Sequence, residues 1–199
     1  MSTAYCFDLD GTVTTTEILP CIASELGIAE EIATLTRVTM EGFITFEESL
    51  RLRSVILGQV PVERVHAIIR DIPLDQTIVD FIEANKERSF IVTGNLDVWT
   101  RQIADKLGCA GFFSKASLDN GKIKLEQILN KGTAVDAVRS VGFDRIIAIG
   151  DGSNDIPMLA KADVAIAYGG VHSPTAAAVG ASNYVIHDGA ILCGLLSAL

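Results

Sequence analysis

The chain has 199 residues, 49% of them hydrophobic, with a mean hydropathy of +0.37, a formal net charge of −9 and a pI of about 4.7. This length suits one well-buried domain or a core with a modest insertion. No apolar run approaches the roughly 18 residues of a membrane span, and no cluster of lysine and arginine residues suits nucleic-acid binding, so we expect neither a membrane nor a nucleic acid as a partner.

The first predicted element is an apolar strand over residues 4–9, which ends directly on acidic residues. A long stretch with helical patterns follows, punctuated by glycine and proline. Its helices are predicted at residues 18–26, 32–40, 46–57 and 62–69. After Pro73, strands alternate with helices. The strands are predicted at residues 89–93, 145–150, 165–167 and 184–186, and the helices at residues 98–107, 133–141 and 190–199.

This order of elements predicts an α/β protein with two parts. Alternating strands and helices indicate a Rossmann-like, doubly wound parallel sheet covered on both faces, and the apolar residues spread along the chain suit such strands. The sequence Asp119-Asn120-Gly121 predicts a hairpin turn within residues 115–125. The helices after the first strand are interpreted as a small helical-bundle cap. We therefore predict a core of residues 1–13 and 73–199 and a cap of residues 14–72.

Acidic and small polar residues collect just past the predicted strand ends. In a parallel sheet the carboxyl ends of the strands meet at one edge, where such sheets bind ligands, so we expect these residues to converge. They are Asp8 and Asp10 after the first strand, Thr93-Gly94-Asn95 after the second, Lys131-Gly132 at a helix start, and Gly150-Asp151-Gly152-Ser153-Asn154-Asp155 after a later strand.

This set of groups matches what phosphoryl transfer requires. Carboxylates can hold Mg²⁺, which prefers oxygen ligands and lets an acidic protein approach a phosphate dianion. A further carboxylate can attack phosphorus. Hydroxyl, ammonium and backbone N–H groups can bind the phosphoryl oxygens, and a second acid can protonate the leaving alkoxide and then activate water.

The motifs also resemble those of a known family. Asp8-Leu9-Asp10-Gly11-Thr12, Thr93, Lys131 and Gly150-Asp151-Gly152-Ser153-Asn154-Asp155 are similar, in this order, to the four motifs of the haloacid dehalogenase superfamily. The resemblance covers essentially the whole chain. It implies a phosphatase in which Asp8 is the nucleophile, Asp10 the general acid and base, and Thr93 and Lys131 the ligands of the phosphoryl oxygens.

The same resemblance implies a metal site and further substrate contacts. Mg²⁺ would be bound by Asp8, the backbone carbonyl of Asp10, and Asp151. Asn154 and Asp155 would position the metal shell and Lys131, with Gly94 and Asn154 also contacting substrate. An acid at Asp10 suits an alkyl phosphate, because an alkoxide leaving group needs a proton, whereas the related ion-pumping ATPases have threonine there.

The predicted cap resembles that of phosphoserine phosphatases, a helical C1-type cap. The resemblance lies in the segment from Met40 to Arg53 and in Glu17, nine residues after Asp8. It implies that Glu17 binds the substrate ammonium and Arg53 its carboxylate, while Met40 and Phe46 line the pocket. The implied reaction is hydrolysis of O-phosphoserine, the last step of serine biosynthesis.

The residues themselves support part of this interpretation. At about 100° per residue, Phe46, Leu50, Arg53 and Leu57 share one helical face. A buried arginine is costly unless it meets an anion, and its planar fork suits a carboxylate. Two alternatives stay open: Arg53 pairs with a cap glutamate, or it extends its head to water. Phosphoserine phosphatases usually have Ser-Gly-Gly at the second motif, so Asn95 places a side chain where the backbone would approach substrate.

Other functions with similar residues were weighed against this one. The same chemistry could serve another small phosphorylated metabolite or transfer the phosphoryl group to an alcohol. A signalling receiver module is disfavoured because its phospho-accepting aspartate lies mid-chain and no helical cap follows its first strand. The expected partner is a small phosphate ester, and the sequence leaves a monomer and a homodimer equally open. Four widely spaced cysteines predict free thiols in the cytoplasm, and the three histidines are predicted to be surface or satisfied residues.

Overall fold

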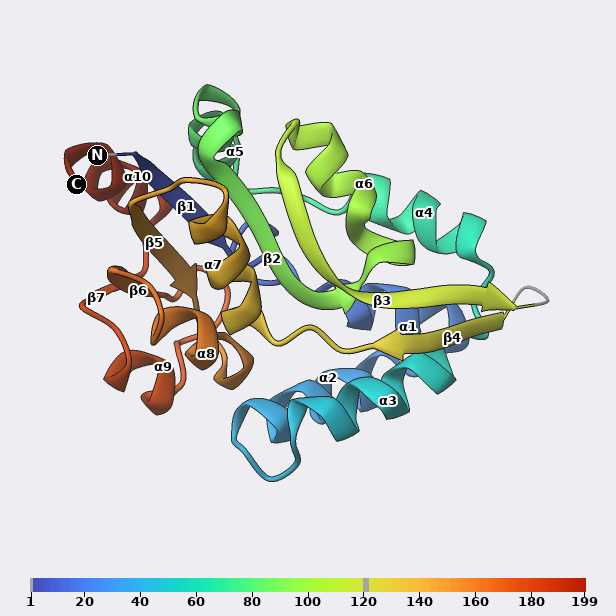
Figure 1. Cartoon of the computed structure of the whole chain (residues 1–199). Coiled ribbons are helices and arrows are strands. Elements are labelled where there is room, and N and C mark those ends of the chain that lie inside the picture. Colours follow the sequence, from blue (N-terminus) through green and yellow to red (C-terminus); the bar gives the residue numbers. More distant parts are fainter. Residues whose placement is uncertain (1, 120–121) are drawn as a thin grey trace.

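The computed structural model describes residues 2–119 and 122–199. Within these ranges seven strands form one sheet, in the order β4-β3-β2-β1-β5-β6-β7 (Figure 1). All neighbouring strands are parallel except β3 and β4. The predicted α/β class with a parallel sheet is therefore confirmed. The strands are β1 (Thr3–Phe7), β2 (Ser89–Leu96), β3 (Ala110–Asp119), β4 (Lys122–Gln127), β5 (Arg145–Gly150), β6 (Val164–Tyr168) and β7 (Tyr184–Ile186).

The seven predicted helices occur in the predicted order among the described residues, together with three helices that were not predicted. They are α1 (Ile18–Ala23), α2 (Ala29–Met40), α3 (Phe46–Leu57), α4 (Val62–Asp71), α5 (Gln76–Ala84), α6 (Asp97–Leu107), α7 (Lys131–Ser140), α8 (Ile156–Leu159), α9 (Ala176–Gly180) and α10 (Gly189–Ala198). Short 3-10 turns lie at Ser24–Leu26, Lys86–Arg88 and Ser153–Asp155. Helix α5 was not predicted. It begins after Asp75, whose side chain accepts hydrogen bonds from the N–H groups of Thr77 and Ile78.

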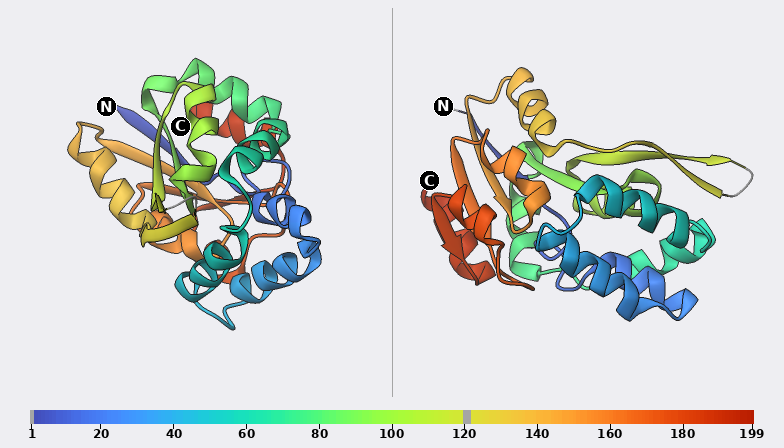
Figure 2. Two further views of the ribbon diagram at one scale, coloured as in Figure 1. Left: turned by 90° about the vertical axis from the view of Figure 1, so that its right-hand side faces the viewer. Right: turned by 90° about the horizontal axis from the view of Figure 1, so that it is seen from below.

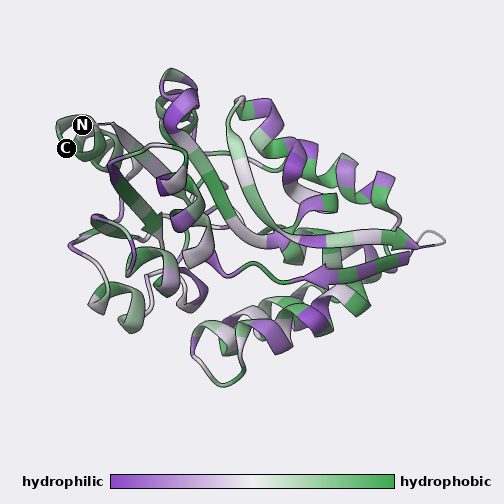
Figure 3. Cartoon of the chain, in the orientation of Figure 1, coloured by the Kyte–Doolittle hydropathy of each residue, from purple (hydrophilic) through white to green (hydrophobic). Residues whose placement is uncertain are grey.

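The central strands are apolar on both faces because helices cover both sides of the sheet. Along β1, Tyr5 and Phe7 pack into one hydrophobic cluster with α5, α6 and α10. Ala4 and Cys6 point the other way, into a second cluster with α7, α8 and α9. This alternation is the period of two that a strand imposes on its side chains. Figure 3 shows β2 and β5 coloured mainly as hydrophobic, whereas α4, which has one exposed side, alternates between the two colours.

Helices α1–α4 gather beyond the carboxyl ends of the strands (Figure 2). The chain leaves the sheet and returns to it at adjoining points: the N–H of Asp75 donates to the carbonyl of Val13 (2.9 Å), and that of Thr15 to the carbonyl of Pro73 (3.0 Å). The β3–β4 hairpin extends along the same side, with β4 packed beside α3. The predicted hairpin pairing is confirmed by Asp119 opposite Lys122, while turn residues 120 and 121 lie outside the described residues. No helix in the described part of the chain has both the length and the apolar character to span a membrane.

The order of the strands determines where a ligand can bind. From β1 the chain continues to β2 and β3 on one side, and only later to β5 on the other side of β1. Such a switch in direction opens a crevice at the carboxyl ends of the two strands involved. Asp8 and Asp151 follow directly after β1 and β5, and the N–H of Asp8 donates to the carbonyl of Ile149 (2.8 Å). The strand pairing thus places both aspartates at this crevice.

Candidate active site

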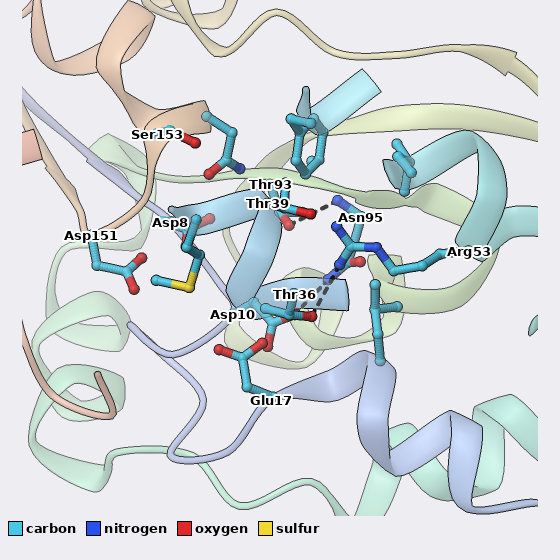
Figure 4. A pocket seen from close by; sticks show the side chains of 16 residues that line it. Asp8, Asp10, Glu17, Thr36, Thr39, Arg53, Thr93, Asn95, Asp151 and Ser153 are labelled. Carbon is cyan, nitrogen blue, oxygen red and sulfur yellow. Dashed lines mark hydrogen bonds between the residues drawn. The ribbon is translucent and has the colours of Figure 1, made fainter. Parts of the chain in front are cut away.

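One pocket brings together residues from three of the four predicted motifs, at the crevice between the strand ends and helices α1–α3 (Figure 4). The predicted site residues that line it are Asp8, Asp10, Glu17, Met40, Phe46, Arg53, Thr93, Gly94, Asp151 and Asn154. Lys131 and Asp155 do not line the pocket. They are buried beside it and act through their contacts with Asp8 and with the loop after β5.

The innermost part of the site is a buried acidic cluster. The carboxylates of Asp8, Asp151 and Asp155 can each offer an oxygen within 4.8 Å of the others. The Lys131 ammonium donates to Asp8 and, at 2.5 Å, to Asp155. Asp155 also accepts from the N–H groups of Asp151 (3.0 Å) and Gly152 (2.8 Å). Asp155 therefore holds both the lysine and the loop that carries Asp151.

This cluster has more negative than positive charge. Burial, and then the charge of Asp155, raises the pKa of Asp8 to about 7 despite the opposing effect of Lys131. Burial and the charges of Asp155 and Asp8 raise the pKa of Asp151 to about 9. Burial alone would lower the pKa of Lys131, but Asp155 and Asp8 outweigh it and hold that pKa above its usual range. The three carboxylates offer hard oxygen ligands, and one ammonium does not balance their charge. The cluster therefore fits a divalent cation.

Asp10 is held separately from this cluster. Its Oδ1 accepts a hydrogen bond from the N–H of Ile18 (2.8 Å), and its Oδ2 accepts one from the side-chain amide of Asn95 (3.1 Å). Gly11, with φ of +76°, allows the chain to turn sharply after Asp10. Burial raises the pKa of Asp10, although both hydrogen bonds act in the opposite direction. Asp10 lines the pocket.

The second motif lies where the sheet is irregular. The pairing of β2 with β3 shifts register between Val92 and Leu96, and such irregularities recur near active sites. The Thr93 hydroxyl oxygen accepts the N–H of Asn95 (3.1 Å), so its own proton is free to donate. The carbonyl of Gly94 accepts the hydroxyl of Ser114 (2.7 Å).

Gly94 lies directly beneath the ring of Phe46. A Cβ added at Gly94 would be only 2.3 Å from the Phe46 Cζ. Because Gly94 has no side chain, the ring of Phe46, the first residue of α3, packs directly against the backbone of β2.

The far end of the pocket carries a buried arginine with neutral partners. Arg53 is 5% exposed and donates to the hydroxyls of Ser49 (2.6 Å) and Thr36 (3.3 Å). Among the described residues no carboxylate lies within ion-pair distance of its guanidinium, so neither alternative, a cap glutamate or a head extended to water, is seen. The predicted helical face is confirmed, since Leu50 and Leu57 are buried, while Arg51 is exposed and pairs with Glu47 (2.7 Å).

Glu17 lies beside Asp10, and their carboxyl groups are in hydrogen-bond contact (Figure 4). Burial, followed by the charges of Asp10 and Asp8, raises its pKa to about 8. The ring of His172 approaches its carboxylate, with Nε2 3.0 Å from Oε1. Glu17 and His172 also line a larger neighbouring cavity of about 990 Å³ between α2 and α9.

Several contacts in the pocket were not predicted. Ser49 is four residues before Arg53, and this helical spacing was a usable signal. Thr36 contacts Arg53, Asn95 contacts Asp10, and His172 contacts Glu17 only through tertiary packing, and no local pattern marks these pairs.

Proteins of known family match the chain over most of its length. The family model described as haloacid dehalogenase-like hydrolase matches residues 6–160. A phosphoserine phosphatase of Methanocaldococcus jannaschii is 31% identical over 81% of this chain and 83% of its own length. One of Archaeoglobus fulgidus is 27% identical over 81% of this chain, a match that spans 51% of that protein. A solved phosphoserine phosphatase with an analogue of its phospho-aspartyl intermediate is 26% identical, with a TM-score of 0.83, and the alignment covers 100% of this chain and 98% of that one. The chain therefore belongs to the haloacid dehalogenase-like hydrolase family.

Proposed function

We propose that the chain is a Mg²⁺-dependent phosphoserine phosphatase, which converts O-phosphoserine and water to serine and phosphate through an aspartyl-phosphate. One observation carries this proposal. A single pocket joins the Asp8 cluster at one end to a buried Arg53 without an ion-pair partner at the other, and Glu17 lines the same pocket beside Asp10. These are the charges that a phosphorylated amino acid would complement. The names of the matching relatives support the same substrate.

In the first step the Asp8 carboxylate attacks phosphorus. The bond from phosphorus to the serine oxygen breaks, and that oxygen takes a proton from Asp10. Thr93 and Lys131 donate hydrogen bonds to the phosphoryl oxygens, with backbone N–H groups around Gly94. Lys131 is poised for this because it already donates to Asp8, and the proton of Thr93 is free.

In the second step Asp10 acts as a base. It removes a proton from a water molecule, whose oxygen attacks the phosphorus of the aspartyl-phosphate. The bond to the Asp8 oxygen breaks and restores the carboxylate. The same side chain can serve both steps because the first step leaves it deprotonated.

The metal ion is proposed from the donor set. Asp8, Asp151 and the backbone carbonyl of Asp10 would hold Mg²⁺, supported by Asn154 and Asp155. When bound, it would neutralise the buried carboxylates and the phosphate, which otherwise repel one another. The raised pKa values of Asp8 and Asp151 support this role, since both reflect an excess of buried negative charge.

Residues 14–72 would act as a cap that selects the substrate, over a core of residues 1–13 and 73–199. Arg53 would bind the serine carboxylate and Glu17 the ammonium, with Met40 and Phe46 against the carbon chain. The contact of Phe46 with Gly94 supports a cap that closes on the core. We place the reaction in the cytoplasm, because all four cysteines are free.

The test is hydrolysis of a panel of phosphomonoesters with Mg²⁺, comparing the wild type with Asp8→Asn. We expect O-phosphoserine to be the preferred substrate and Asp8→Asn to lose at least about a thousandfold in kcat, since no covalent intermediate can form. Phosphate release measures both. If Asp8→Asn kept full activity, Asp8 would not be the nucleophile. If another ester were preferred, O-phosphoserine would not be the natural substrate.

A further inference from the structure

Asn95 makes a contact in this chain that a glycine at the same position could not make. Its side-chain amide donates to Oδ2 of Asp10 (3.1 Å), across 85 positions of sequence. Phosphoserine phosphatases usually have glycine there, as the second-motif pattern Ser-Gly-Gly shows. Glycine has no side chain, so the Asp10 carboxyl group would lack this donor.

The surroundings make the Asn95 side chain well placed and firmly held. It is 6% exposed, and its backbone N–H is bound to the Thr93 hydroxyl. Figure 4 shows its amide directed toward Asp10, beside the guanidinium of Arg53. A buried amide in this position is costly unless it is hydrogen-bonded, and Asp10 is the partner of its NH₂ group.

Two N–H donors hold the Asp10 carboxyl group, which also contacts the carboxyl group of Glu17. Ile18 binds one oxygen through its backbone N–H, and Asn95 binds the other. With both oxygens held, rotation of the carboxyl group about its Cβ–Cγ bond is restricted. With only Ile18 as donor, the second oxygen could turn away from the ester oxygen that it must protonate.

We propose that Asn95 is a positioning residue for the general acid: its amide holds the Asp10 carboxyl group in the orientation that protonates the leaving oxygen. This rests on the proposed function. In that step the bond between Asp8 and phosphorus forms while the bond from phosphorus to the ester oxygen breaks. The electron pair stays on the ester oxygen, which takes the Asp10 proton and leaves as the alcohol.

The test uses the different needs of two leaving groups. The serine alkoxide requires a proton to leave, whereas 4-nitrophenolate does not. We compare kcat/KM for O-phosphoserine and 4-nitrophenyl phosphate in the wild type, Asn95→Leu and Asn95→Gly, with Mg²⁺ present. General acid catalysis contributes about 10²–10⁴-fold, so we expect both variants to lose at least about tenfold on O-phosphoserine and less than about threefold on the aryl ester.

Binding is followed separately through inhibition by the product, L-serine. We expect its inhibition constant to change less than about twofold in both Asn95 variants. An equal loss on both substrates, with the folded state verified by circular dichroism, would overturn the proposal in favour of a structural role. A loss confined to KM and serine binding would overturn it in favour of a direct substrate contact.

Asp10→Asn distinguishes this inference from the function on which it rests. It should show the same selectivity for the alkyl ester, with a larger loss. If Asp10→Asn is selective and the Asn95 variants are not, only the positioning role fails. If Asp10→Asn lowers both substrates equally, the general-acid assignment fails, and the role of Asn95 fails with it.

Discussion

Both ends of the pocket contain buried charged side chains, but their partners differ. At the inner end, Lys131 and three carboxylates neutralise one another in part, through direct ion pairs. At the outer end, Arg53 is surrounded by hydroxyl groups and has no ion pair within the described residues. The inner end is largely complete before a ligand arrives, whereas the outer end lacks its counter-charge. Under the proposed function, the preformed network would carry the chemistry, and the charge of Arg53 would select the substrate.

Removing Lys131 should destabilise the chain more than any other substitution in or beside the pocket. In Lys131→Met, the buried carboxylates lose their ammonium partner, and breaking such a pair costs about 3–5 kcal/mol. We expect the free energy of unfolding without Mg²⁺ to fall by that amount, as measured by urea denaturation. The matched control is Lys161→Met, which removes an exposed pair with Asp136 and should cost less than about 1 kcal/mol. Equal effects of the two variants would contradict the central role of the network.

The next effect concerns Mg²⁺ and pH. Asp8 and Asp151 have pKa values of about 7 and about 9 in the folded chain, above those of unfolded carboxyl groups, near 4. The metal-free folded state therefore binds protons more tightly, and its free energy of unfolding falls as pH rises from about 4 to 9. Mg²⁺ requires the ionised carboxylates, so its stabilising effect should grow with pH, to about 2.7 kcal/mol at a hundred times Kd.

Thermal unfolding in EDTA and in Mg²⁺ measures this effect. The difference in Tm should be larger at pH 8.5 than at pH 5.5. A difference that shrinks at the higher pH would show that the carboxylates of the cluster are not the metal ligands.

Replacing Arg53 should have a more modest effect, limited to substrates with a carboxylate. Arg53→Met should lower kcat/KM for O-phosphoserine by at least about tenfold, since a hydrogen bond to a charged group contributes about 1.5 kcal/mol or more. 4-Nitrophenyl phosphate, which has no carboxylate, should change less than about threefold. The control, Arg51→Met, alters an exposed arginine on the same helix and should leave both values unchanged. Equal losses on both esters would show that Arg53 does not bind the serine carboxylate.

The sequence allowed much of the architecture to be predicted, because its signals are local. The apolar strand before Asp8 and the repeating face through Leu50 and Arg53 each depend on a few neighbouring residues. Convergence of the motifs followed from one rule, that parallel strands end at the same edge of a sheet. Helix α5 was missed although Asp75 is a suitable N-cap and Ile78 and Ile82 repeat at helical spacing.

The remaining contacts depend on how distant elements pack. Asn95 reaches Asp10, and His172 reaches Glu17, only after the loops carrying them have been positioned by the sheet. In the sequence, Asn95 was predicted to lie at the strand ends but its partner was not, and His172 was predicted to be a surface or satisfied histidine. No periodicity encodes such pairs, since their partners are set by the fold and not by spacing along the chain.

The adjoining exit and return of the chain near Val13 and Asp75 also bear on how such a protein can diversify. The helices between these two points form an insertion whose two ends are hydrogen-bonded to each other at the sheet. Connections within such an insertion can change in length with a modest entropic cost. The ends of the insertion stay fixed at the sheet while its sequence varies. Under the proposed function, substitutions within residues 14–72 would change which ester is accepted while Asp8 is retained. The backbone of Ile18 ties the two together, because its N–H binds Asp10 whatever side chain position 18 carries.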